Sequence, residues 1–575
     1  MQQKLINEFV DFVRQYDVTS ADYTKIFDEY TTKVEYEVES SINNNIVEMI
    51  LENPHSVIIT GNAGDGKTRI CRNVYKALTN KDLIEWSLKG IEEVQFKGNT
   101  FYIVKDLSEL TDERINSILN SLNNTIHKKN EFYIIAANEG KLTFSLYADE
   151  KLKELIKIIE PQFSRMDTQN EYPLKVYNLL HCSSSIYADK IIASWNEEKN
   201  WEICKKCSLK NRCIIHHNHL KLANDKIQKR VIRLYKTLDT LDVHMTMREL
   251  LIQLAYVHLG GLNCRDIHKV NASGLIYHAD KVYYQNLYGL NIELDVFNEI
   301  PGVNEIRKFD PGKFSNSVID DFILNGDLAE PEVEKVHKEL FGNEIDTNYG
   351  YYKKDFHYYR VDKNNNQQVI EEIVEKWLPR LRRKYFFEAE HRGYKGENLI
   401  PYKTRKEFIQ ILSKKENSFS LTLKQKIVQG LNNYFANNLV FSPEHTLYVV
   451  SEKLYVYRTI SFSNIKWIIE DDQLEFDRAS SCIYIDINNV KLKLDFSVFE
   501  YLCRLAEGGL RHILHDDVEI RLQNFKNQLI AKAENTNMLR LQILKYIDDY
   551  DAYSICTIEI HSNEENDNDD EDDEW

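Results

Sequence analysis

The sequence predicts an α/β protein built on a parallel β-sheet, followed by a mixed α+β region. From residue 51 to about 200, short apolar runs typical of buried strands alternate with helical stretches, and this order favours parallel strands covered by helices on both faces. From about residue 440, runs rich in β-branched and aromatic residues predict a second, smaller sheet. A chain of 575 residues is too long for one core, so several domains are expected.

Periodicity and composition divide the chain into six segments. They are an N-terminal helical segment (1–50) expected to pack on the sheet, the sheet core (51–200), a cysteine-rich module with a helical lid (201–290), a mostly helical middle region (291–435), an α+β domain (436–562) and an acidic tail (563–575). The expected strands of the core are residues 56–60, 100–105, 131–137 and 174–180. Those of the α+β domain are 447–450, 454–460, 465–469 and 483–494, followed by helices at 496–514 and 518–535.

Charge and apolar content restrict where the protein acts. The net charge is −17, and nine of the carboxylates lie in the tail, so DNA contact has to come from local patches or from partners. The tail itself is expected to be disordered and solvated; the alternative is that it mimics nucleic acid in a basic groove. No run of about 18 apolar residues occurs, and the N-terminus does not resemble a secretion signal, so a cytoplasmic protein without a membrane partner is expected.

A glycine-rich loop joins the first expected strand to a helix. Residues 61–68 read Gly-Asn-Ala-Gly-Asp-Gly-Lys-Thr and match G-x-x-x-x-G-K-[ST] at every fixed position. Lys67 would reach the β- and γ-phosphates, Thr68 would place its hydroxyl on Mg²⁺, and the loop amides would surround the phosphates. The pattern predicts a P-loop NTPase that uses ATP and Mg²⁺. The expected contacts are Gly61, Asn62, Ala63, Gly64, Asp65, Gly66, Lys67, Thr68 and Arg69.

Polar residues follow the next two expected strands and complete the predicted site. In one interpretation, which we favour, Asp106 is the acid on the magnesium side and Asn138 senses the γ-phosphate. In the other, Asn138 and Glu139 themselves occupy the acid strand. Glu139 or Glu109 would be the general base for hydrolysis. Asp106 is also well placed to cap a helix, since Ser108 and Glu109 follow it.

Arginines beyond the sheet are candidates to contact the γ-phosphate. Arg248 starts a helix in the expected lid and would close over the phosphate, although a surface position on an amphipathic helix is nearly as plausible. Arg165 is a weaker candidate for a finger that acts on a neighbouring subunit.

A cysteine cluster follows the core. Cys204, Cys207 and Cys213 form a C-x₂-C-x₅-C pattern, and thiolates at this spacing can share a tetrahedral Zn²⁺ ion. Cys182, His217 and His219 are the candidates for a fourth ligand. The alternative is a turn of reduced, partly buried thiols without metal.

Two basic segments, residues 226–233 and 380–384, are candidates for phosphate contact with nucleic acid. Solvated helix faces are the favoured interpretation of both.

Taken together, these motifs resemble the DptF family of DNA phosphorothioation-dependent restriction proteins, which are AAA-like P-loop ATPases. The resemblance rests on residues 61–68, 105–110 (Lys-Asp-Leu-Ser-Glu-Leu), 135–142 (Ile-Ala-Ala-Asn-Glu-Gly-Lys-Leu), the three cysteines, and 246–251 (Thr-Met-Arg-Glu-Leu-Leu). It covers residues 51 to about 265. Ile214 departs from it, because the family pattern has a proline after the third cysteine.

The resemblance implies an ATPase acting in prokaryotic antiphage defence, with partner subunits that include a DNA translocase-like ATPase. It implies the same roles for Lys67, Thr68, Asp106 and Asn138, and a cysteine module at residues 204–213. Three hypotheses follow: an ATP-hydrolysing motor or switch that acts on DNA directly or through partners, a non-hydrolysing scaffold, and a signalling NTPase that forms homo-oligomers to activate an effector. The sequence assigns no function to residues 291–575.

Overall fold

The computed structural model of this chain divides into two compact units, Met1–Pro401 and Tyr402–Trp575. It describes residues 4–17, 40–83, 86–87, 90–128, 130–163, 172–240, 243–269, 274–290, 292, 298, 301–342, 344–347, 349–361, 367–389, 404, 407–408, 410–411, 420–435, 446–450, 456–471, 481–508, 516–532, 538–547 and 552–561. Arg165 and the acidic tail lie outside these residues.

A five-stranded sheet organises the first unit, with the strand order β2-β3-β4-β1-β5. Its strands are β1 (Ser56–Thr60), β2 (Ile91–Phe96), β3 (Asn99–Val104), β4 (Glu131–Ala137) and β5 (Leu174–Asn178). All neighbouring pairs are parallel except β2 with β3. The prediction of an α/β fold with a mostly parallel sheet is therefore confirmed.

The antiparallel strand β2 was not predicted. It pairs with β3 through a two-residue turn at Lys97 and Gly98, whose φ angles are 49° and 83°. Two consecutive residues with positive φ form the type of turn whose twist suits a hairpin. β2 is an edge strand with little buried surface, so its sequence lacks the continuous apolar run that marks the central strands β1 and β4.

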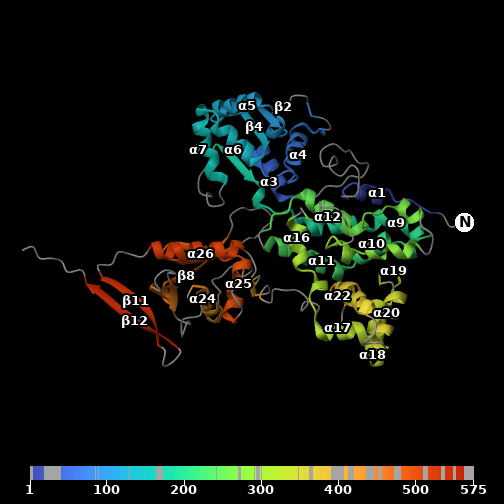
Figure 1. The fold of residues 1–575 in the computed structure, drawn as a ribbon. Helices are drawn as coiled ribbons and strands as arrows, with labels where there is room; N and C mark the ends of the chain where they lie inside the picture. The colour runs from blue at the N-terminus through green and yellow to red at the C-terminus, as the bar shows by residue number, and fades with distance from the viewer. Residues whose placement is uncertain are drawn as a thin grey trace, which may run out of the picture. The chain divides into compact units, whose positions relative to one another are not determined.

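Helices cover both faces of the sheet, as Figure 1 shows. On one face α5 (Asp112–Thr125), α6 (Glu139–Tyr147) and α7 (Lys153–Ile159) share a hydrophobic core with side chains of the strands. On the other lies α4 (Lys67–Thr79), and α3 (Ser41–Glu52) packs against it, with Asn73 Nδ2 donating to Asn43 Oδ1 over 3.0 Å. Strands buried from both sides explain the nearly uninterrupted apolar sequence of β1 and β4.

The two described N-terminal helices pack on different partners. α3 packs on α4, which follows the first strand of the sheet. In contrast, α1 (Glu8–Arg14) packs on the helical region, where the Phe9 ring meets Trp201 edge-on at 5.9 Å. The N-terminal segment therefore contacts both the sheet part and the helical part of the first unit.

The rest of the first unit is helical. Its core includes Phe322, Phe341, Trp377 and Tyr385, among other buried apolar side chains. The helices are α8 (Ala188–Trp195), α9 (Glu198–Lys206), α10 (Ile214–Leu222), α11 (Asp225–Thr240), α12 (Met247–Leu259), α13 (Cys264–Lys269), α14 (Tyr283–Asn286), α16 (Pro301–Lys308), α17 (Ser317–Asn325), α18 (Pro331–Phe341), α19 (Glu344–Thr347), α20 (Tyr349–Val361), α21 (Gln367–Glu372) and α22 (Leu378–Glu388).

The basic segment at residues 380–384 is a buried part of this helical core, so the interpretation as a solvated face is wrong. Its four cationic residues are at most 8% exposed. Each is paired with a carboxylate: Arg380 with Asp280, Arg382 with Asp320, Arg383 with Asp310, and Lys384 with Asp346 and Glu388. Charges buried in this way need partners, because the protein interior solvates them poorly. Their cationic groups are therefore committed to holding helices together rather than to binding phosphate.

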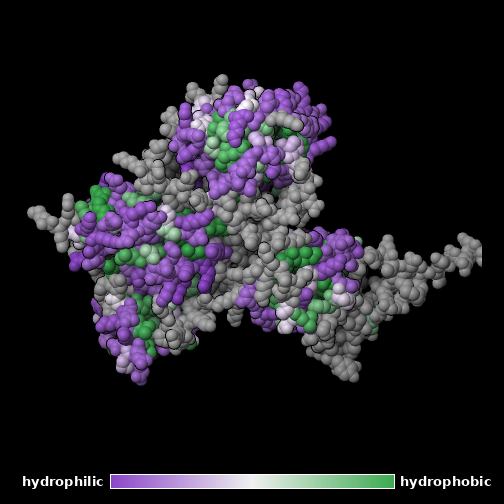
Figure 2. All heavy atoms as spheres, turned by 180° about the vertical axis from the view of Figure 1, so that it is seen from behind, coloured by the Kyte–Doolittle hydropathy of each residue, from purple (hydrophilic) through white to green (hydrophobic). Residues whose placement is uncertain are grey.

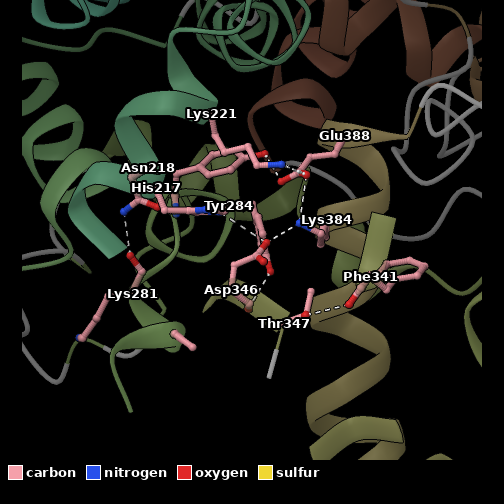
Figure 3. Close-up of polar contacts among 12 residues, drawn as sticks. His217, Asn218, Lys221, Lys281, Tyr284, Phe341, Asp346, Thr347, Lys384 and Glu388 are labelled. Atoms are coloured by element: carbon pink, nitrogen blue, oxygen red, sulfur yellow. Dashed lines mark hydrogen bonds and ion pairs between the residues drawn. The ribbon is translucent and has the colours of Figure 1, made fainter. Parts of the chain in front are cut away.

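Figure 3 draws one of these interactions, the ion pair of Asp346 and Lys384, together with residues around it. Lys384 Nζ also lies 3.0 Å from Glu388 Oε2, and His217 Nε2 of α10 lies 3.6 Å from Asp346 Oδ2. Burial alone would raise the pKa of Asp346, but the Lys384 ammonium outweighs burial and lowers it. The pair therefore stays ionised and joins α10, α19 and α22.

The second unit contains two antiparallel sheets and three described helices. One sheet has the order β12-β11-β7-β6 and the other β10-β9-β8. The elements are α24 (Leu421–Phe435), β6 (Thr446–Val450), β7 (Val456–Ser461), β8 (Ile465–Asp471), β9 (Ser481–Ile487), β10 (Val490–Lys493), α25 (Phe496–Ala506), α26 (Asp516–Ala531), β11 (Met538–Ile547) and β12 (Ala552–His561). The long β11–β12 hairpin was not predicted. α24 belongs to this unit, so the expected segment 291–435 spans two units.

Most of the described surface is hydrophilic on the face that Figure 2 draws, with hydrophobic residues in small patches. In the described ranges, no helix combines the length and the apolar character that crossing a membrane requires.

Removing one side of a buried ion pair should destabilise the first unit strongly. Arg383 holds Asp310 through two bonds of 2.7 and 2.8 Å, and Asp310 is 1% exposed. We expect Arg383→Ala to lower the free energy of unfolding by about 3–5 kcal/mol, because it leaves a buried carboxylate unpaired. Urea denaturation followed by tryptophan fluorescence measures this. Lys229→Ala, which removes an exposed cation, is the control and should change stability by at most about 0.5 kcal/mol; equal effects of the two variants would contradict the assignment.

Candidate functional site

The glycine-rich loop adopts a conformation that ordinary residues rarely reach. β1 ends at Thr60, and Gly61, Gly64 and Gly66 follow with φ angles of 153°, 97° and 90°. Gly66 is the N-cap of α4, which begins at Lys67. Positive φ turns successive backbone N–H groups toward one concave side, and the helix N-terminus adds its own unpaired amides. The backbone therefore provides the elements of an anion-binding site.

Lys67 lies inside the loop. Its side chain is buried, and Nζ donates to the carbonyl oxygens of Gly61 at 2.9 Å and Asn62 at 2.7 Å. Thr68 is the second residue of α4 and is half-buried, whereas Arg69 after it is exposed. The ammonium group and the Thr68 hydroxyl thus stand at the same end of the helix, as the phosphate-loop prediction requires.

Asp65 contacts both the loop itself and His244, which is distant in the sequence. Its side chain is 3% exposed, and Oδ2 accepts a hydrogen bond from the Asn62 backbone N–H at 2.6 Å. The other oxygen, Oδ1, lies 3.0 Å from His244 Nε2. His244 was not singled out in the sequence, since a single histidine 179 residues away carries no local signal.

Arg248 lies directly against the loop. Its backbone N–H donates to the Gly64 carbonyl at 3.2 Å, and a Cβ atom on Gly64 would approach Arg248 Cβ to 2.7 Å. The position of Arg248 is fixed by Thr246 and Glu249, which form a capping box at the start of α12. The structure therefore brings Arg248 to the glycine-rich loop from the helical region, where a lid was expected.

Asp106 and Asn138 both follow strands at the carboxyl edge of the sheet, on β3 and β4. Asp106 Oδ1 accepts hydrogen bonds from the backbone N–H and hydroxyl of Ser108, at 2.8 and 2.5 Å, and so caps a short 3₁₀ helix. Asn138 caps α6 by accepting from the Gly140 N–H at 3.0 Å. The helix-capping role considered for Asp106 is thus present. A cap does not use all acceptor positions of a carboxylate, so each residue keeps further capacity to bind.

The thiol of Cys71 on α4 lies close enough to both Asp106 and Lys67 to be influenced by their charges. Burial raises the pKa of its thiol to about 12, the Asp106 carboxylate raises it further, and the Lys67 ammonium opposes this. The Cys71 sulfur also lies 3.8 Å from the Val104 carbonyl, two residues before Asp106. Asp106 and Lys67 therefore flank the first turns of α4.

A cavity of about 600 Å³ joins the loop to the end of β4. It is lined by Gly61, Asn62, Asn138, Glu139, Gly140, Thr143, Phe144 and Leu180. Glu139 is held there by Asn178 at the end of β5, whose Nδ2 donates to Glu139 Oε2 over 3.1 Å. The Asn178 side chain is fixed at its other end, because Oδ1 accepts from the Leu180 N–H. Asn178 was missed, although its place after a parallel strand was a usable signal. Glu109, the other predicted base, is paired with Lys105 at 2.9 Å.

Comparison of this chain with protein-family models, with curated proteins and with solved structures finds no match.

The three predicted cysteines surround the end of α9 and the start of α10. Cys204 lies in the last turn of α9, Cys207 is its C-cap, and Cys213 is the N-cap of α10. A fourth cysteine, Cys264 at the start of α13, interacts with this group. In the residues that the structure describes, no three His, Cys, Asp or Glu side chains are arranged to hold an ion.

The two histidines considered as zinc ligands make other contacts. His217 faces Asp346, and His219 Nδ1 lies 3.0 Å from Asn196 Oδ1. Cys182 follows β5 in the segment that borders the phosphate loop, and its role as a ligand stays a prediction.

His219 and His258 belong to a buried network around Asn196. His258 Nδ1 donates to the Leu254 carbonyl at 2.8 Å, so its Nε2 accepts from Asn196 Nδ2 at 2.9 Å. Burial lowers the pKa of His258 to about 4 and that of His219 to about 3. Both imidazoles are therefore neutral in the folded protein near pH 7.

These shifts predict a loss of stability in mild acid. Below pH 6.5 the unfolded chain binds protons on these imidazoles, whereas the folded chain binds none until about pH 4, so acid favours unfolding. Each group should cost about 1.4 kcal/mol per pH unit between these limits. We expect His258→Gln to lower stability at pH 7 and to flatten its decline from pH 6.5 to 5, as measured by urea denaturation. His357→Gln removes an exposed imidazole and is the control; identical declines for wild type and His258→Gln would contradict the account.

Proposed function

We propose that this chain is an ATPase subunit of a prokaryotic antiphage DNA-restriction system, hydrolysing the β–γ phosphoanhydride of Mg-ATP in the cytoplasm. The observation that carries the proposal is the loop at residues 61–68, with three glycines at positive φ, a buried lysine and a helix N-terminus behind it. A triphosphate is the ligand that this combination of amides and one ammonium group suits best.

The residues present fit the ligand. Lys67 would exchange its two carbonyl partners for phosphate oxygens, Thr68 would contribute a hydroxyl to Mg²⁺, and Asp106 would act on the magnesium side. Bound ATP supplies the phosphoanhydride whose hydrolysis drives change in the protein. Asn138 would contact the γ-phosphate region, and Glu139, held by Asn178, would take the proton of the attacking water.

Contact between the loop and residues 244–248 supports coupling to the helical region. Asp65 with His244, and Gly64 with Arg248, connect the phosphate loop to α12. A ligand that changes the loop would therefore change the position or order of α12, with Arg248 as the group nearest to the phosphates. We propose that this motion is passed on to DNA or to partner subunits.

The defence context comes from the sequence resemblance to the DptF family. It suggests other subunits of a restriction complex as partners, DNA contact either direct or through those partners, and recognition that depends on a phosphorothioate mark. Assembly of several copies is a further part of the proposal, since a neighbouring copy would be needed to supply a finger residue.

A non-hydrolysing, ATP-dependent scaffold is the second candidate function. The observation that favours it is the capping role of Asp106 and Asn138, which gives each a structural purpose apart from catalysis. A signalling NTPase that assembles on a trigger uses the same binding site, so assembly assays separate it from the first proposal.

The first experiment tests nucleotide binding. Lys67→Ala removes the ammonium group from the loop and should weaken Mg-ATP binding at least tenfold in calorimetry and abolish ATP turnover. Lys76→Ala, at the other end of the same helix, removes an exposed ammonium paired with Asp82 and should leave both unchanged. Binding of Mg-ATP by neither the wild type nor Lys76→Ala would refute the proposed function. Binding without turnover in the wild type would favour the scaffold.

The second experiment tests how Glu139 is positioned. Glu139→Gln should retain ATP binding and lose at least about 100-fold in kcat, as expected for a general base. Asn178→Ala should lower kcat several-fold with little change in KM, because it removes the hydrogen bond that positions the carboxylate. Asn178→Ala with an unchanged kcat, or Glu139→Gln with full turnover, would contradict these roles.

A further inference from the structure

Four cysteines from separate elements gather beside the N-terminal helix. Cys204 lies in the last turn of α9, Cys207 and Cys213 lie between α9 and α10, and Cys264 comes from the start of α13, more than fifty residues later. The chain has only nine cysteines in 575 residues. A gathering of four is therefore a feature that composition alone does not explain.

One residue, Asn7, touches two of these sulfurs. Its side-chain Nδ2 donates to Cys204 Sγ at 3.3 Å, and its backbone N–H points to Cys264 Sγ at 3.5 Å. Asn7 is 3% exposed, and its Oδ1 accepts from the Phe9 N–H, which fixes the side chain as the cap of α1. Two N–H donors from one residue thus bring the sulfurs of Cys204 and Cys264 into the same small region.

The electrostatic interactions among the thiols connect the whole group. Cys264 is influenced by Cys204 and Cys207, Cys213 by Cys264 and Cys204, and Cys204 by Cys207. Every thiol of the group therefore lies within electrostatic range of at least two others.

We propose that Cys204, Cys207, Cys213 and Cys264 form a structural zinc site with four thiolate ligands, in which Cys264 is the fourth ligand. C-x₂-C spacing with two further cysteines is the donor set of closed, tetrahedral Zn²⁺ sites. All four cysteines are free thiols rather than disulfides. Binding exchanges four thiol protons for one Zn²⁺ ion, and the protons pass to solvent.

Coordination requires a small rearrangement. The thiols as they stand do not meet the geometry of an ion site in the described ranges. A cysteine reorients its sulfur by one side-chain rotation, χ1, between staggered positions, and the proposal requires the four sulfurs to converge by such rotations. The N–H groups of Asn7 would then donate to two zinc-bound thiolates, as residues around thiolate sites do.

The site would join three parts of the first unit. α1 through Asn7, the α9–α10 segment through three ligands, and α13 through Cys264 would all be held at one point. Because α13 follows α12, the ion would also fix the far end of the helix that begins at the phosphate loop. The proposal concerns structure, and it stands independently of whether ATP is hydrolysed.

Metal content of the purified full-length chain tests the proposal. We expect inductively coupled plasma mass spectrometry to find about one Zn²⁺ per wild-type chain. In Cys264→Ser the zinc content should fall to below about a tenth of that value. Cys503→Ser removes a buried thiol of the second unit and Cys182→Ser the alternative ligand; both should keep the metal. Wild-type protein without metal that also fails to take up added Zn²⁺, or a disulfide between Cys204 and Cys264, would overturn the proposal. So would zinc retained at full occupancy in Cys264→Ser.

Spectroscopy on wild-type protein covers the case in which Cys264→Ser fails to fold. Co²⁺ exchanged for Zn²⁺ should give the visible absorption of a tetrahedral site with strong sulfur-to-metal bands typical of four thiolates. Removal of zinc by a chelator should lower the melting temperature, and added Zn²⁺ should restore it. Absorption typical of an octahedral site, or a melting temperature indifferent to chelation, would count against a structural zinc.

Discussion

The backbone of the glycine-rich loop at residues 61–68 is the constraint on which the rest of the first unit depends. Its open form needs positive φ at three glycines, and it is kept by contacts on both sides: Asp65 from within and the start of α12 from without. A side chain at Gly64 would collide with Arg248, so the loop and the helix fit only while that position lacks a Cβ. The loop therefore connects the sheet, through β1, to the helical region, through the start of α12.

Buried charge specifies how the helices of the first unit meet. The cationic side chains of α22 are distributed among carboxylates of four other segments, and Asp346 with Lys384 joins α10 to α19 and α22. Such pairs add little to the free energy of unfolding compared with apolar packing. They do require a defined geometry, because displacing one partner leaves an unpaired charge in the interior. The ion pairs therefore restrict how α10, α19 and α22 can be placed relative to one another.

Sequence reasoning located the parts whose signals are local. β1 and β4 are nearly continuous apolar runs, and the glycines of the loop allow the positive φ angles that its turn needs. Both features can be located from residues that are adjacent in the sequence. It failed where the decisive partner is remote. The residues of α22 look like a solvated basic face until Asp280, Asp310, Asp320 and Asp346 are brought to them by the fold. Cys264 and His244 likewise contact residues that are distant in the sequence. β2 was missed because it has no apolar run that would predict a strand, although it pairs with β3.

Hydrogen exchange of the full-length chain with and without Mg-ATP tests the central claim most directly. If the loop binds the triphosphate and is joined to α12, amides of residues 61–68 and those of 244–249 should both exchange more slowly when Mg-ATP is present, while the sheets of the second unit are unaffected. Unchanged exchange at residues 61–68 under saturating Mg-ATP would contradict the account.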